Sequence, residues 1–261
     1  MGYFIGIDIG STSTKTAVLD GDGAVVSLIT RPTGWSSTDT AEALRCHLTD
    51  EGYFSDDSVC VATGYGRVCV PYADKTITEI SCHAKGAVFL YKTDTLTVID
   101  IGGQDTKTIR IENGQVIDFI MNDKCSAGTG RFLEVMANRL ALRPEALCSL
   151  AENGKNVTIS SLCTVFAESE VISLIGRGEK KENIAYAVVD SVIKKVSSQV
   201  RRIETHGAPV CLTGGLSKIP YIPRAISKEL HTEILSDELG IYSGALGAAL
   251  YARKLQTKEH S

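Results

Sequence analysis

The sequence predicts an α/β protein built from two lobes, on three observations. Strand-like and helix-like segments alternate along the chain. The ten residues at 7–16 are repeated at 99–108 with seven identical positions. Each copy follows an apolar run and leads into a second alternating run that ends in a turn. A chain of 261 residues and 28.0 kDa is long enough for two lobes, each with a core of its own. We expect one copy of the repeat in each lobe.

The elements follow from hydrophobic periodicity and turn residues. We expect the first lobe over 1–92 and the second over 93–239, with a C-terminal helix at 240–261 that returns to the first. Apolar runs bounded by Gly-rich turns predict one hairpin within 3–29 and another from 93. Strands are predicted at 58–62 and 209–212, and helices at 39–50, 77–91, 129–140, 164–176 and 184–205. The last of these carries an apolar stripe that predicts a core-facing side: Ile184, Val188, Val192, Val196, Val200 and Ile203. The C-terminal helix has small residues on one side, which predicts close helix packing at a lobe junction.

The two hairpin bends have the chemistry of a phosphate site. Glycines let backbone amides approach an anion, and successive amides form a concave nest for it. A carboxylate beside such a nest makes sense if hydrated Mg²⁺ lies between them, and Asp8 and Asp100 are therefore predicted to face the metal. Either bend alone could be an ordinary turn, but their repetition in register favours a nucleotide. The predicted phosphate-binding residues are Gly10, Ser11, Thr12, Ser13, Thr14, Lys15, Gly102, Gly103 and Gln104. No P-loop or dinucleotide fingerprint is present.

A third glycine pair, Gly214-Gly215, follows the predicted strand at 209–212. It is either a simple turn or a place where adenosine lies against exposed backbone. Beside two phosphate hairpins, we expect the adenosine site.

Composition and charge exclude several classes of function. A net charge of −4 gives no electrostatic reason to bind nucleic acid or an anionic membrane. The sequence has no apolar run long enough for a membrane span and no signal peptide, so we expect a cytoplasmic protein. Its eight cysteines are then expected as thiols, and the absence of Cys-x2-Cys argues against a zinc or ferredoxin site within one chain.

Two of these cysteines, Cys125 and Cys163, precede predicted helices. Helix N-terminal amides favour a thiolate there, although most free cysteines are simply small, partly buried residues. The residues alone leave metal ligation open.

The chain resembles the activator proteins of 2-hydroxyacyl-CoA dehydratases, which are related to the ATPase subunits of benzoyl-CoA reductase within the actin-like ATPase superfamily. The resemblance covers essentially the whole chain, and two segments, 121–136 and 160–173, are specific to the group. Further matching segments are 62–67, 79–84 and 244–249. Two departures, Ser126 for the usual Ala and Leu162 for the usual Thr, leave both cysteines in place.

The resemblance implies a fold, a cofactor and an activity. The fold would be two ribonuclease-H-like lobes with ATP or ADP in the cleft between them. Cys125 and Cys163 would bind a [4Fe-4S] cluster shared across a homodimer, since such a cluster takes four thiolates. The function would be ATP-driven delivery of a low-potential electron to a dehydratase or related iron–sulfur reductase, with ferredoxin or flavodoxin as donor. Gln104 would orient the attacking water, with Asp105 as the weaker alternative.

Two other classes remain as rivals. A small-molecule kinase of the same superfamily would use Asp105 or another acid as base, and would not need the two cysteines. A chaperone-type ATPase would need a peptide-binding module, for which the chain has no spare length.

Overall fold

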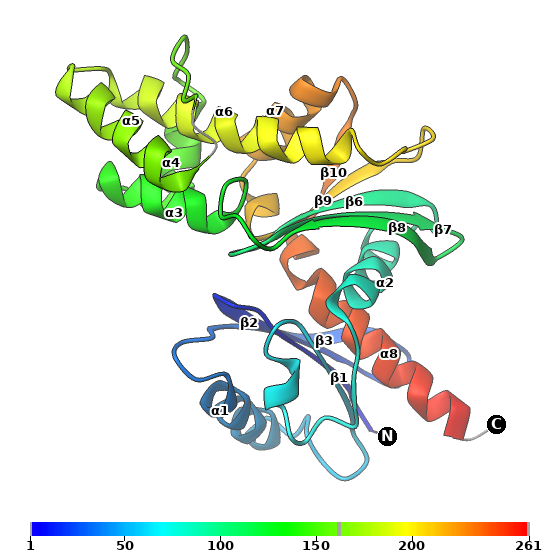
Figure 1. Cartoon of the computed structure of the whole chain (residues 1–261). Coiled ribbons are helices and arrows are strands. Elements are labelled where there is room, and N and C mark those ends of the chain that lie inside the picture. Colours follow the sequence, from blue (N-terminus) through cyan, green and yellow to red (C-terminus); the bar gives the residue numbers. More distant parts are fainter. Residues whose placement is uncertain (1, 161–162, 260–261) are drawn as a thin grey trace. The chain divides into compact units, whose positions relative to one another are not determined.

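The computed structural model describes residues 2–160 and 163–259, which form two compact units (Figure 1). Unit 1 consists of Met1–Thr95, Ile111–Val116 and Leu239–Ser261, and unit 2 of Leu96–Arg110 and Ile117–Glu238. Ser161 and Leu162, which belong to a segment quoted for the family resemblance, lie outside the described residues.

Unit 1 is a five-stranded sheet with helices on its two faces. Its elements are β1 (Phe4–Ile9), β2 (Ser13–Leu19), β3 (Val25–Pro32), α1 (Ser37–Asp50), β4 (Val59–Thr63), η1 (Arg67–Cys69), β5 (Lys75–Thr76), α2 (Glu79–Tyr91) and α8 (Ser243–Glu259), with η3 (Glu238–Tyr242) leading into α8. The strand order is β3-β2-β1-β4-β5, antiparallel from β3 to β1 and parallel from β1 to β5. Strand β1 is buried along its whole length because α1 and α8 contribute to separate cores on opposite sides of it.

Unit 2 repeats this plan around one larger core. Its elements are β6 (Leu96–Ile101), β7 (Thr106–Glu112), β8 (Gln115–Asn122), α3 (Gly130–Arg139), α4 (Pro144–Ala151), α5 (Thr164–Gly176), α6 (Lys181–Val200), β9 (Val210–Gly214), η2 (Gly215–Lys218), α7 (Tyr221–Leu230) and β10 (Ile234–Ser236). The sheet order is β10-β9-β6-β7-β8. Read from β8, this is the order of the first sheet with β6 in the place of β1. The internal repeat therefore extends from ten residues to a whole sheet.

Close packing of α8, predicted from its small residues, is present within unit 1. A Cβ on Gly247 would lie 1.8 Å from the carbonyl oxygen of Cys82 in α2. A Cβ on Gly6 would lie 2.0 Å from the carbonyl oxygen of Ala245. Because no side chain fits in either place, α8 lies backbone against backbone on α2 and β1.

Most predicted elements are present, and the differences have local causes. The helix predicted at 184–205 is α6, which starts earlier at Lys181 because a polar first turn precedes the apolar stripe, and ends at Val200. The stripe is buried throughout, and Ile203 stays in the core although it follows the helix. The short helices α4 and α7 were not predicted. Among the described residues, no helix is both long and apolar enough to cross a membrane.

Candidate functional site

The first predicted phosphate hairpin is the bend between β1 and β2 in unit 1. Ser11 and Thr12 are exposed at its tip, and the Lys15 ammonium lies 2.5 Å from the Ser13 hydroxyl. Thr14 differs from them: it is 2% exposed, and its hydroxyl pairs with that of Thr33 at 3.0 Å. Four side chains of the bend are therefore available to an anion, whereas Thr14 offers only its backbone.

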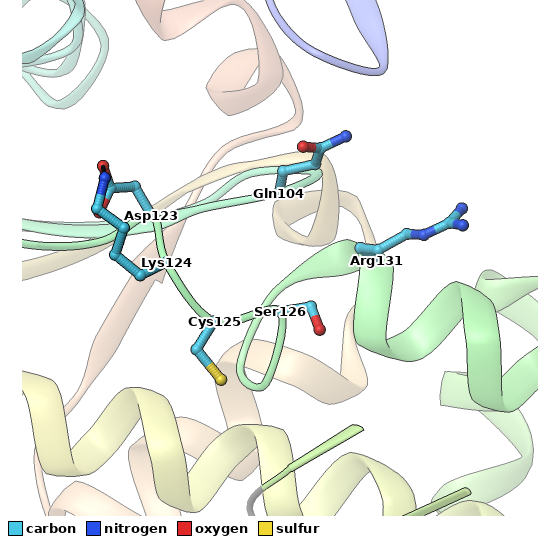
Figure 2. Close-up of a pocket in the computed structure, with 6 residues that line it drawn as sticks. All are labelled: Gln104, Asp123, Lys124, Cys125, Ser126 and Arg131. Atoms are coloured by element: carbon cyan, nitrogen blue, oxygen red, sulfur yellow. Dashed lines mark hydrogen bonds and ion pairs between the residues drawn. The ribbon is translucent and has the colours of Figure 1, made fainter. Parts of the chain in front are cut away.

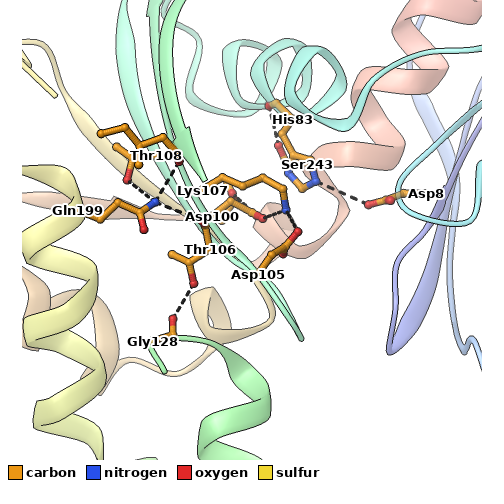
Figure 3. Close-up of polar contacts among 12 residues, drawn as sticks. Asp8, His83, Asp100, Asp105, Thr106, Lys107, Thr108, Gly128, Gln199 and Ser243 are labelled. Carbon is orange, nitrogen blue, oxygen red and sulfur yellow. Dashed lines mark hydrogen bonds and ion pairs between the residues drawn. The ribbon is translucent and has the colours of Figure 1, made fainter. Parts of the chain in front are cut away.

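The Asp8 carboxylate lies at the end of β1, beside this bend, and is 8% exposed. It is bounded by glycines: a Cβ on Gly64 would lie 2.3 Å from Asp8 Oδ1, and a Cβ on Gly244 would lie 2.4 Å from Oδ2. His83 Nε2 lies 3.8 Å from Oδ2 (Figure 3). A carboxylate bordered by glycine backbone on two sides, with an imidazole no nearer than 3.8 Å, suits a hydrated divalent cation.

The second hairpin is the bend between β6 and β7 in unit 2, and its carboxylate is held differently. Asp100 is 2% exposed and accepts a 2.7 Å hydrogen bond from the Thr213 hydroxyl. Buried Lys107 lies 3.5 Å from Asp100 and 2.7 Å from Asp105 (Figure 3). Asp100 thus has a cation of the same hairpin beside it, which it shares with Asp105. Gln104, at the tip, is exposed.

Lys107 occupies the same position of the repeat as Lys15, but its environment is the reverse. Lys15 reaches the bend and a serine hydroxyl, whereas Lys107 is 2% exposed between two carboxylates. Sequence reasoning missed this pair, although the repeat itself contained the signal: copy two has Asp105 where copy one has Ser13.

The glycine pair spans the end of β9 and the start of η2. Gly214 has φ +85°, and a Cβ there would lie 2.3 Å from the carbonyl oxygen of Ile101, so packing of β9 on β6 explains it. Gly215 has open space on its Cβ side. Only Gly215 is left for a ligand against exposed backbone.

The Cys125 segment lies between β8 and α3, and Cys125 is exposed. The prediction that it stands at a helix start is wrong in detail, because a turn separates it from α3. The Thr129 N–H and hydroxyl both donate to the Ser126 carbonyl, and Gly128 takes φ +87°. The Asn122 amide holds the loop from the other side by donating to the carbonyls of Cys125 and Ala127.

Cys163, by contrast, is the N-cap residue of α5, and it too is exposed. The residues next to the two cysteines meet: the hydroxyls of Ser126 and Thr164 lie 2.6 Å apart. The serine that departs from the family pattern therefore joins the two cysteine-bearing segments.

Two backbone hydrogen bonds connect the second hairpin to the start of α3. The Gly130 N–H donates to the Gly102 carbonyl at 2.9 Å, and the Arg131 N–H donates to the Gly103 carbonyl at 2.7 Å. Gln104 and Cys125 line one pocket beside these hydrogen bonds (Figure 2), and its volume is about 250 Å³. Its remaining lining residues are Asp123, Lys124, Ser126 and Arg131. The predicted phosphate bend and the Cys125 loop thus line the same pocket.

Four of the other six cysteines are buried. Burial raises the pKa of Cys82, Cys148 and Cys211 to about 12, so these thiols stay protonated at neutral pH. Burial likewise raises the pKa of Cys60. Within residues 2–160 and 163–259, no three His, Cys, Asp or Glu side chains gather as a metal site would require.

Comparison with known proteins identifies the family. A model of the BadF/BadG/BcrA/BcrD ATPase family matches residues 5–252. The chain is 45% identical over 263 residues to the (R)-2-hydroxyglutaryl-CoA dehydratase activating ATPase of Acidaminococcus fermentans, covering 98% of this chain and 99% of that protein. It is 44% identical over 253 residues to the 2-hydroxyisocaproyl-CoA dehydratase activator of Clostridioides difficile, covering 96% and 94%. The chain belongs to the BadF/BadG/BcrA/BcrD ATPase family and is an ATPase of that family.

Solved structures agree with the fold. The activator of the 2-hydroxyisocaproyl-CoA dehydratase from Clostridium difficile, with bound ADPNP, superposes with a TM-score of 0.91 at 42% identity, covering 99% of this chain and 97% of that one. A ROK family glucokinase from Streptomyces griseus has a TM-score of 0.64 at 16% identity over 97% of this chain and all of that one, a likeness of fold alone. The predicted class, α/β with two actin-like lobes, is confirmed.

Proposed function

We propose that this ATPase is an iron–sulfur electron-transfer activator, which delivers a low-potential electron to a 2-hydroxyacyl-CoA dehydratase or a related reductase. The observation that carries the proposal is the pair of hydrogen bonds from Gly130 and Arg131 to the carbonyls of Gly102 and Gly103. These hydrogen bonds connect the predicted phosphate bend to the start of α3, which follows the Cys125 loop. A displacement of the bend is then transmitted to Cys125.

The nucleotide part of the proposal assigns the two bends to the phosphates and Gly215 to adenosine. Asp8 faces the hydrated Mg²⁺, because glycines border its carboxylate and the His83 imidazole stays 3.8 Å from it. Asp100 supports the second bend, since Lys107 and Thr213 already hold its oxygens. This division of roles refines the expectation that both carboxylates hold the metal.

Gln104 is proposed to orient the attacking water. Its side chain is exposed in the pocket wall, where an amide can both donate to and accept from a water. Asp105 is the weaker choice, because its carboxylate is engaged by the Lys107 ammonium at 2.7 Å.

The cluster part of the proposal rests on two exposed thiols in segments joined by the Ser126–Thr164 hydrogen bond. A [4Fe-4S] cluster bound by Cys125 and Cys163 would supply a one-electron carrier. One chain offers half of the usual four thiolates, so the donor set fits a cluster shared by two copies.

The surface around Cys163 supports a second copy as its occupant. The helix that Cys163 caps exposes large apolar side chains, with Val165 67%, Phe166 65%, Ile172 51% and Ile175 44% exposed. An apolar helix face of this size, next to a thiol that needs a partner, fits a two-fold interface. Burial of these side chains would also keep water from the cluster.

We propose the activated enzyme from sequence similarity and the electron donor from redox chemistry. Relatives named as dehydratase activators support a 2-hydroxyacyl-CoA dehydratase as the partner, and a low-potential carrier requires a donor such as ferredoxin or flavodoxin. The kinase alternative has the weaker support, because the likeness to the glucokinase is one of fold alone.

Iron analysis tests the proposal. Anaerobically purified protein should be brown and carry about four irons per dimer. Cys125→Ala and Cys163→Ala should each lose the iron chromophore, while Cys46→Ala, the matched exposed cysteine on α1, should keep it. A monomer with four irons per chain, or a colourless ATPase that phosphorylates a sugar, would overturn the proposal.

A further inference from the structure

His83 is a buried side chain for which neither hairpin accounts. It lies on α2, is 7% exposed, and directs Nε2 at the Asp8 carboxylate from 3.8 Å (Figure 3). This separation is too long for a direct hydrogen bond, but it keeps the imidazole and the carboxylate in electrostatic contact.

The space between the two side chains is kept by a glycine. A Cβ on Gly244 would lie 2.4 Å from Asp8 Oδ2 and 3.0 Å from His83 Nε2. Any larger residue at this position would displace one of the two groups. On the other side of the carboxylate, the Gly64 backbone packs against Oδ1, where a Cβ would lie 2.3 Å away. Glycines thus line both oxygens, and the His83 imidazole approaches Oδ2 beside Gly244.

The backbone that carries His83 is fixed by the contact of α2 with α8. The Ser243 hydroxyl donates to the His83 carbonyl at 3.0 Å, and Ser243 is fully buried. A Cβ on Gly86 would lie 1.9 Å from the Ser243 carbonyl oxygen, so the two backbones touch there as they do at Gly247. Since neither helix can slide without a clash, the distance from His83 to Asp8 is set by the fold.

We propose that His83 is a positioning residue for Asp8, acting through Nε2 to hold the carboxylate in the orientation that faces the metal. The inference rests on the proposed function, in which Asp8 faces hydrated Mg²⁺. It adds that the metal's affinity depends on a side chain from α2 that does not itself reach the phosphates.

The test uses the full chain with ADP and Mn²⁺ as the probe, and free Mn²⁺ is measured by electron paramagnetic resonance. His83→Gln retains an amide nitrogen near the position of Nε2, whereas His83→Asn places its amide nearer Nδ1. We expect His83→Asn to weaken Mn²⁺ binding about tenfold, equal to about 1.4 kcal/mol, and His83→Gln to restore most of the affinity. Binding of ADP without metal should be unchanged in both, and His47→Ala on α1 is the matched control.

A double-mutant comparison with Asp8→Asn separates the inference from the proposed function. If His83 acts through Asp8, the two amide variants should bind Mn²⁺ equally in the Asp8→Asn background. Equal binding by His83→Gln and His83→Asn in the natural background, or an unchanged difference without Asp8, would overturn the role of His83 alone. Mn²⁺ binding that survives Asp8→Asn intact would overturn the metal assignment itself, and the role of His83 with it.

Discussion

Replacing Lys107 by methionine removes the ammonium that lies 3.5 Å from Asp100 and 2.7 Å from Asp105. Methionine has a similar length and keeps the apolar contacts of the stem, so the change isolates the charge. Two carboxylates are left in its place, and Asp100 is 2% exposed. The expected result is loss of stability in the sheet of unit 2.

The size of the effect follows from burial. Removing one partner of a buried ion pair costs about 3–5 kcal/mol, because the remaining charge is left without compensation. The repeat provides the matched control: Lys15→Met removes an ammonium whose contact is with a serine hydroxyl, and it should cost about 1 kcal/mol. Pairing Lys107→Met with Asp100→Asn should recover part of the loss, because the buried charge is then gone.

Hydrogen exchange of the segment 96–110 is the suitable assay, because it reports this hairpin separately from unit 1. A loss of about 3–5 kcal/mol should make the amides that exchange only on unfolding of the unit exchange roughly 10²–10⁴ times faster in Lys107→Met. Equal acceleration by Lys15→Met and Lys107→Met, measured on their respective hairpins, would refute the assignment of different roles to the two lysines.

Three further predictions concern the glycine pair, the hydrolytic water and the buried thiols. Gly214→Ala should destabilise unit 2, because Gly214 has a positive φ and lies against a carbonyl of β6. Gly215→Ala should leave the fold intact and weaken ATP binding, both measured by calorimetry. A larger loss of stability in Gly215→Ala than in Gly214→Ala would contradict the packing. Gln104→Ala should lower the ATPase rate about 10²-fold with unchanged ATP affinity, and a full rate would remove the residue from the reaction. Burial raises the pKa of Cys211 to about 12 from 9.0, so the unfolded state loses its proton first and stability should fall as pH rises from 9.0 towards 12. Thermal unfolding of Cys211→Ala should show a shallower fall over that range, and Cys46→Ala should not.

Much of the fold was predictable because the repeat fixes it twice. The phrase around Asp8 and the phrase around Asp100 predicted two hairpins, and each hairpin stands in a sheet of the same strand order. The apolar stripe of α6 and the small face of α8 also identified buried surfaces correctly. These features are local periodicities, which a sequence displays directly.

The arrangement within the candidate site was less predictable, since it depends on contacts between distant residues. His83 meets Asp8 only because α2 and α8 touch at Gly86 and Gly247, and nothing in the segment around residue 83 indicates that distance. The turn after Cys125 depends on Gly128 taking a positive φ, which the Gly-rich loop allowed but did not require. Short helices such as α4 have too few turns for a periodic pattern to stand out.

The measurement that tests the account most directly starts from anaerobically purified protein, which the proposal expects to be an iron-loaded dimer. It compares the rate at which an iron chelator removes that iron in the presence of ATP and of ADP. Hydrogen bonds from the start of α3 to the carbonyls of Gly102 and Gly103 join the bend proposed for the phosphates to the Cys125 loop. We therefore expect the rate, or the reduction potential of the bound iron, to differ between the two nucleotides. By linkage, reduction should change the preference for ATP over ADP by the same factor. Identical chelation rates and identical potentials with ATP and with ADP would contradict the proposed coupling.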